Sequence, residues 1–151
     1  MRTQCLLVLG VAALVLSPVR AADKDKEEAK FDSAKLVGTW TYVSAEEDGK
    51  KKTADDFKKA SVEITKDTIM LKGEDATYVI KYTLDTKKDP VQVAMEITKG
   101  PQGEGAKSAG IIELKGDELK LCYNPMSEEA PKEFGAKADS KLHFFVLKRK
   151  K

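Results

Sequence analysis

The chain has 151 residues, with 27 basic and 25 acidic side chains and only two cysteines. This near-balance of charge argues against a dedicated nucleic-acid binder, which needs a surplus of Lys and Arg on one face. The length predicts a single domain with one hydrophobic core.

The first 22 residues have the layout of a secretory signal peptide. Arg2 gives a positive start, an apolar run follows at residues 5–19, and small residues precede the cleavage point. We expect cleavage after Ala21, with Ala22 as the alternative. Because the apolar run is too short for a comfortable membrane span, we expect an exported protein in the periplasm or outside the cell, with no membrane anchor after cleavage.

Cleavage removes Cys5 and leaves Cys122 as the only cysteine of the mature chain. No intrachain disulfide is then possible, so the fold must rest on its core. Cys5 stands at the start of the apolar run, so it is not placed as a lipoprotein cysteine. Residues 22–34 are charged and poor in apolar groups, which predicts a disordered linker.

The remaining residues, 35–151, alternate between apolar and polar side chains in short segments. This period of two predicts β-strands. A short helix is predicted at 53–60, where Thr53 can cap the amino end and Asp55 and Asp56 favour the helix dipole. Long loops are expected at 99–107 and 124–140. We predict strands at residues 38–45, 61–65, 68–72, 76–84, 91–98, 109–115, 118–123 and 141–149.

Short connections between eight such strands favour an up-and-down meander. Closure removes the exposed sheet edges that invite aggregation. We therefore predict an all-β fold, an eight-stranded antiparallel barrel with one short inserted helix, in preference to a two-sheet sandwich.

The triplet Gly38-Thr39-Trp40 resembles the Gly-x-Trp signature of the lipocalins. The resemblance implies that Trp40 closes one end of the barrel. It also implies that a basic residue late in the last strand packs across the ring, and Arg149 stands at that place. Such a cation–π contact contributes about 0.5–2 kcal/mol.

The segments 36–40, 112–123, 130–134 and 146–149 together resemble an uncharacterised lipocalin-like domain family that is abundant in planctomycete bacteria. The likeness covers residues 35–149. It implies an exported barrel domain without an established activity. The chain departs from true lipocalins because it has no Thr-Asp-Tyr signature, no disulfide and no helix after the last strand.

The residues that could carry catalysis are few. His143 is the only histidine and lies in the middle of the last predicted strand, while Cys122 alternates with core residues and should face away from the core. Nucleophilic catalysis by Ser or Cys normally needs a histidine base nearby. No acidic cluster has a metal-ligand spacing. We therefore expect no enzyme activity, no cofactor and no metal site.

Two functions remain open for a monomeric exported domain. In the first, the barrel binds a small apolar ligand. In the second, the barrel is filled by side chains and its loops bind an exported protein partner. An interior cavity of roughly 300 Å³ or more would favour the first. The side chains expected to line such a cavity are Trp40, Tyr42, Tyr78, Tyr82, Met95, Tyr123 and Phe144.

Overall fold

The computed structural model describes residues 31–151. The predicted signal peptide, residues 1–21, and most of the predicted linker, 22–34, lie outside the described residues. Inside them, the chain is already folded at Ser33, where the 3-10 helix η1 (Ser33–Leu36) begins. The Asp32 side chain caps η1 by accepting a hydrogen bond from the Ala34 amide at 3.1 Å.

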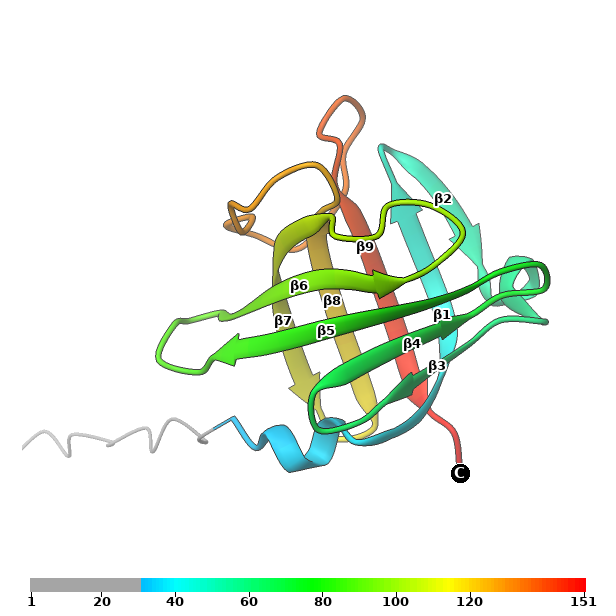
Figure 1. The fold of residues 1–151 in the computed structure, drawn as a ribbon, viewed down its shortest axis with the longest axis horizontal. Coiled ribbons are helices and arrows are strands. Elements are labelled where there is room, and N and C mark those ends of the chain that lie inside the picture. The colour runs from blue at the N-terminus through cyan, green and yellow to red at the C-terminus, as the bar shows by residue number, and fades with distance from the viewer. Residues whose placement is uncertain (1–30) are drawn as a thin grey trace, which may run out of the picture.

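The described residues form an antiparallel β-barrel (Figure 1). Its strands follow one another in the sheet in chain order from β3 to β9, and β9 pairs with β1 to close the ring. The predicted fold class is thus confirmed. The strands are β1 (Gly38–Glu47), β2 (Lys50–Thr53), β3 (Ser61–Ile64), β4 (Thr68–Lys72), β5 (Thr77–Asp85), β6 (Val91–Lys99), β7 (Lys107–Lys115), β8 (Glu118–Asn124) and β9 (His143–Arg149).

β2 is an additional strand that the hydrophobic pattern does not predict. Asp48 and Gly49 both have positive φ, 49° and 82°. Two consecutive residues of this kind make the tight turn that suits a β-hairpin. The hairpin pairs β2 with the second half of β1, while the first residues of β1 pair with β3.

The predicted helix at 53–60 is shorter than expected. It is the 3-10 helix η2 (Ala54–Phe57), and the described residues contain no α-helix. Thr53 still starts it: its amide donates to the Asp56 carboxylate at 2.7 Å. After Phe57 the chain turns instead of continuing the helix: the Ala60 amide donates to the Phe57 carbonyl at 2.8 Å, and β3 begins at the next residue, Ser61.

The strands bury one row of side chains each inside the barrel. Alternation along a strand sends every second side chain inward, and removing these from water drives folding. The inward core residues on β3 to β9 include Val62, Ile64, Ile69, Ile80, Val93, Met95, Ile112, Leu119, Leu121 and Leu147.

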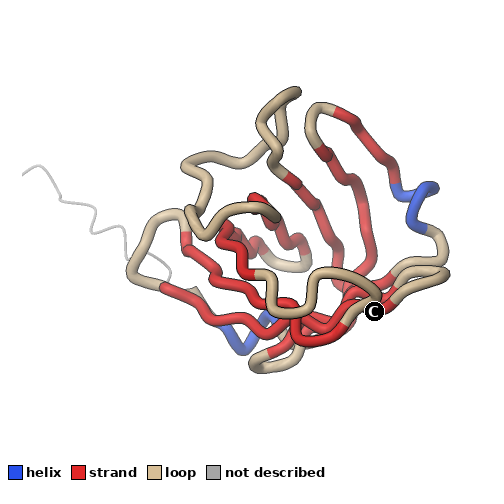
Figure 2. Tube along the Cα trace, turned by 45° about the horizontal axis from the view of Figure 1, so that its top comes forward, coloured by secondary structure: helices blue, strands red, loops and turns tan. Residues whose placement is uncertain are grey.

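The two ends of the barrel differ. The closed end, at the bottom of Figure 1, carries η1, the β7–β8 turn and the C-terminus. The open end carries the β1–β2 turn, η2 and the long loops 99–107 and 124–142. Figure 2 brings this end forward and shows the loops beside the strands.

A second, smaller core lies outside the barrel wall. Loop 124–142 covers the outer face of β8 and β9, where Cys122 is 0% exposed and the Phe134 and Phe144 rings lie 6.0 Å apart. The Cys122 thiol donates to the Gly135 carbonyl at 3.4 Å. The loop is also tied to the β1–β2 turn, because the Gly49 amide donates to the Ala136 carbonyl at 2.6 Å.

Candidate functional site

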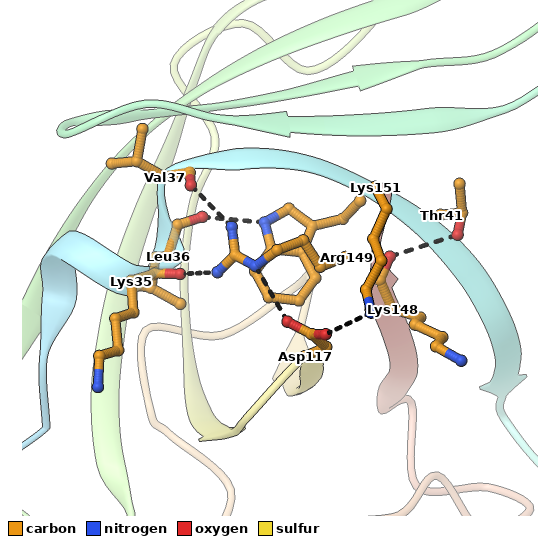
Figure 3. A network of polar contacts seen from close by, with 9 residues as sticks. Lys35, Leu36, Val37, Thr41, Asp117, Lys148, Arg149 and Lys151 are labelled. Atoms are coloured by element: carbon orange, nitrogen blue, oxygen red, sulfur yellow. Dashed lines mark hydrogen bonds and ion pairs between the residues drawn. The ribbon is translucent and has the colours of Figure 1, made fainter.

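The closed end is sealed by Trp40, which lies under the side chain of Arg149; Figure 3 shows Arg149 and its polar partners. Trp40 is 0% exposed, and its indole N–H donates to the Leu36 carbonyl at 2.9 Å. The Arg149 guanidinium carbon lies 4.4 Å from the centroid of the Trp40 ring, as the lipocalin resemblance implies.

Arg149 is held in place from several sides. It donates to the backbone carbonyls of Val37, at 3.0 Å, and Lys35, and it faces the Asp117 carboxylate at 3.5 Å. Gly38 leaves the space for this, because a Cβ there would lie 2.8 Å from an Arg149 guanidinium nitrogen. A ligand therefore has no entry at this end.

The barrel interior is almost filled. The cavity inside it has a volume of about 30 Å³. Its lining is apolar apart from two tyrosines, Tyr42 and Tyr123. Ligand pockets start at roughly 300 Å³. The interior cavity is thus about a tenth of that volume.

The predicted lining residues are dispersed by the fold. Tyr42, Met95 and Tyr123 border the small cavity. Tyr82 is 5% exposed and its hydroxyl donates to the Thr65 carbonyl at 2.8 Å, a structural role. Tyr78 packs against the core.

The prediction that Phe144 faces the interior is wrong. Phe144 lies on the outer face and packs against Phe134, while its neighbour Phe145 borders the cavity. The cause is the parity of β9. Arg149 must face Trp40, so counting back by two places Leu147, Phe145 and His143 on the inner face.

Aromatic rings gather where the interior meets the open end. The open-end ring cluster comprises Tyr42, Phe57, Tyr123, His143 and Phe145. Phe57 of η2 stacks on Tyr42 with ring centroids 4.3 Å apart. Phe145 lies 5.8 Å from Tyr42 and 6.0 Å from Tyr123, and His143 lies 5.4 Å from Tyr123. Such ring pairs contribute about 0.5–1.5 kcal/mol each beyond their burial.

One ion pair borders this cluster. Lys52 of β2 binds the Glu47 carboxylate at 2.6 Å. In the hairpin register Lys52 lies opposite Ala45, and Glu47 lies opposite Lys50. Lys52 and Glu47 are therefore diagonal neighbours across β1 and β2, a distance that long side chains span. Sequence reasoning did not assign Glu47 or Lys52 to a site, although the Asp48-Gly49 hairpin signal could have placed them side by side; it did expect Phe57 to pack onto the body of the fold, as it does on Tyr42.

Burial sets the protonation of the cluster. It raises the pKa of Tyr42 to about 12, with a further contribution from the Glu47 carboxylate. Burial also raises the pKa of Tyr123. It lowers the pKa of His143; the Glu47 carboxylate opposes this lowering, and the Lys52 ammonium adds to it. At neutral pH the cluster therefore presents uncharged hydroxyls and an uncharged imidazole next to one ion pair.

The hydroxyls of Tyr42 and Tyr123 form no hydrogen bond with other described residues, and neither hydroxyl oxygen is fully buried without a partner. They can donate to or accept from a ligand.

Cys122 lies on the outer face beneath loop 124–142, and burial raises the pKa of its thiol. The Cys122 thiol and the His143 imidazole thus lie on opposite faces of the barrel wall.

Loop 124–142 carries a groove near the open end. Its volume is about 520 Å³. Met126, in the same loop, is 83% exposed. The lining is mixed in polarity and consists of Asn124, Ser127, Glu129, Ala130, Pro131, Lys132, Glu133, Ser140 and Leu142.

Loop 99–107 is fixed against the barrel rather than free. The Gly105 amide donates to the Ile97 carbonyl at 2.8 Å, and the Ile97 amide donates to the Ala106 carbonyl at 3.0 Å. Gly100 is required by a close approach, because a Cβ there would lie 2.5 Å from the Tyr78 ring. In Figure 1 this loop passes across the front of the open end.

Within residues 31–151, no group of three or more His, Cys, Asp or Glu side chains is placed to hold a metal ion. That part of the chain also contains no helix of the length and apolarity that a membrane span requires. Comparison of the chain with protein-family models, curated proteins and solved structures found no match.

Proposed function

We propose that the protein is an exported, non-catalytic member of the lipocalin-like family named above, and that it binds a protein partner through the open end of its barrel. The filled interior is the observation that carries this proposal. A cavity of about 30 Å³ is a tenth of the smallest usual ligand pocket, so recognition falls to the outer surface. The Gly38-x-Trp40 start and its contact with Arg149 support the family membership.

The open end has the features of a recognition surface. Loops on a rigid scaffold are where binding usually resides. Loop 124–142 packs on the outer core through Phe134 and the Gly135 carbonyl, exposes Met126 and forms a groove of about 520 Å³. Methionine suits such a surface because its side chain adapts to irregular partners.

The test is site-specific photo-crosslinking in the native host. A photoreactive amino acid at Met126 samples the open end, and the same amino acid at Lys148 samples, as a matched control, the part of the outer face of β9 near the closed end that is exposed. We expect one defined protein adduct from position 126 and none from position 148. Equal labelling from both positions, or no adduct at 126, would contradict the proposal.

A second candidate is a small uncharged apolar ligand. The specific observation in its favour is the apolar lining of the cavity bordered by Tyr42 and Tyr123, whose hydroxyls have no hydrogen bond among the described residues. Such a ligand would need these rings to move. A thermal-shift screen against fatty acids, isoprenoids, haem and pigments tests it, because a ligand that binds only the folded state raises the melting temperature. No shift with any of them rejects the ligand.

A further inference from the structure

A groove crosses the outer face of β5, β6 and β7 beside the start of loop 124–142, where the Ala109 amide donates to the Ser127 carbonyl at 3.0 Å. It has a volume of about 350 Å³. Its floor is a row of small side chains, since the strand register sets Thr83 of β5 opposite Ala94 of β6, and Ala94 opposite Ala109 of β7. A second hollow of about 240 Å³ shares these residues and extends the groove toward the closed end.

Charged side chains form one wall of this groove. The same register places Lys81, Glu96 and Lys107 in the next row across β5, β6 and β7. None of the three forms an ion pair with a described residue, although they are neighbours across the sheet. At the β7 end the groove is bordered by Glu128, which is also exposed and outside any such pair.

We propose that this groove, whose floor and charged wall lie on β5, β6 and β7 and only whose edge is formed by Glu128 of the open-end loop, docks an extended peptide segment of a partner protein that carries both acidic and basic side chains. Charge complementarity selects this occupant. Two ammonium groups flank a carboxylate along the wall, and a second carboxylate stands at the end. A purely anionic polymer would meet Glu96 and Glu128, and a purely cationic one would meet Lys81 and Lys107.

The dimensions and chemistry of the groove fit the same occupant. Three neighbouring strands span about 10 Å, which about three residues of extended chain also cover. The small floor leaves room for peptide side chains. Sugars stack on exposed ring faces, but the only ring in the lining, Tyr82, is 5% exposed and belongs to the interior. An apolar chain would leave the charged wall unpaired.

The experiment uses short blocked peptides in three sets: alternating acidic and basic residues, all acidic, and all basic. Binding is followed by amide chemical shifts of the ¹⁵N-labelled protein. We expect only the alternating set to shift the amides of Thr83, Ala94 and Ala109, and added salt to weaken its binding. Absence of shifts at these amides, or equal binding by all three sets, overturns the proposal.

Variants tie the result to the wall of the groove. Lys107→Gln should weaken the alternating peptide about two- to fivefold, as removal of a rim ion pair does, and Ala94→Leu should fill the floor and abolish binding. Lys148→Gln, with the same loss of charge on the outer face of β9, should change nothing. If the same amides shift with protein concentration and without peptide, the occupant is a second copy of this chain and the peptide proposal is wrong.

Discussion

Removal of the Trp40 ring should be the most damaging single change to this barrel. Trp40 is 0% exposed and its indole N–H holds the Leu36 carbonyl at 2.9 Å. Truncating a buried Trp to Ala costs about 3–5 kcal/mol, and the carbonyl that loses its partner adds about 1–3 kcal/mol. The sum is comparable to the whole stability of a small domain, about 5–15 kcal/mol. Trp40→Ala should therefore leave little folded protein at ambient temperature.

A milder pair of variants allows the contact with Arg149 to be measured. Trp40→Leu keeps part of the apolar volume, and Arg149→Met keeps the packing of the side-chain stem while removing the charge. Arg149 is partly solvated, so we expect its loss to cost about 1–3 kcal/mol from the cation–π contact and the hydrogen bonds to backbone carbonyls together. The double variant should be less destabilised than the sum by about 0.5–2 kcal/mol.

The assay is equilibrium unfolding in urea followed by circular dichroism, because Trp40 is the only tryptophan and its fluorescence disappears with it. Arg149→Met combined with Phe57→Ala at the opposite end of the barrel is the control, and those two effects should add within about 0.5 kcal/mol. Strict additivity for the Trp40 and Arg149 pair would refute the reasoning, since it would mean that the two side chains do not stabilise each other.

Three further outcomes are expected. The pKa of His143 is lowered in the folded state below its ordinary 6.5, so near that pH the imidazole binds more protons in the unfolded chain than in the folded one. Its contribution to stability is therefore present above pH 6.5 and is lost as the pH falls through the folded pKa. His143→Gln should remove this part of the pH dependence of the unfolding free energy in urea titrations, and an unchanged pH profile would argue against the reasoning. The Cys122 thiol is 0% exposed and its pKa is raised by burial, so iodoacetamide should label it only after unfolding, whereas rapid labelling of the native protein would show that loop 124–142 opens readily. Intact mass of the protein from its native host should show that residues 1–21 or 1–22 are absent; a species that retains Cys5 would be incompatible with the signal-peptide prediction.

Sequence reasoning succeeded where one face of a strand is apolar. The alternation in residues 91–98 and 118–123 predicts β6 and β8 nearly to their ends, because burial of every second side chain is recorded directly in the sequence. The hydrophobic pattern did not predict β2, because Lys50, Lys51 and Lys52 bury no apolar face. Its pairing comes from the turn at Asp48 and Gly49.

The candidate site was less predictable, because it depends on contacts between distant segments. Phe57 meets Tyr42 only because the β1–β2 hairpin folds η2 back onto the barrel. The burial of the Cys122 thiol depends on loop 124–142, and nothing in the strand pattern shows that a loop covers the outer face. Phe144 is different: the required position of Arg149 fixes the parity of β9, so the correct assignment of Phe145 was already contained in the sequence.

The outer core makes the barrel wall uneven in thickness. Along β8, Leu119 lies inside at 1% exposure and Cys122 outside at 0%, so this strand is covered on both faces, as a central strand of a layered α/β sheet is. On the opposite side, Lys81, Thr83 and Ala94 of β5 and β6 face solvent directly. Opening events follow the weakest local packing. Amide hydrogens of β7, β8 and β9 should thus exchange with solvent last, and local opening of the barrel should occur first in the strands from β3 to β6.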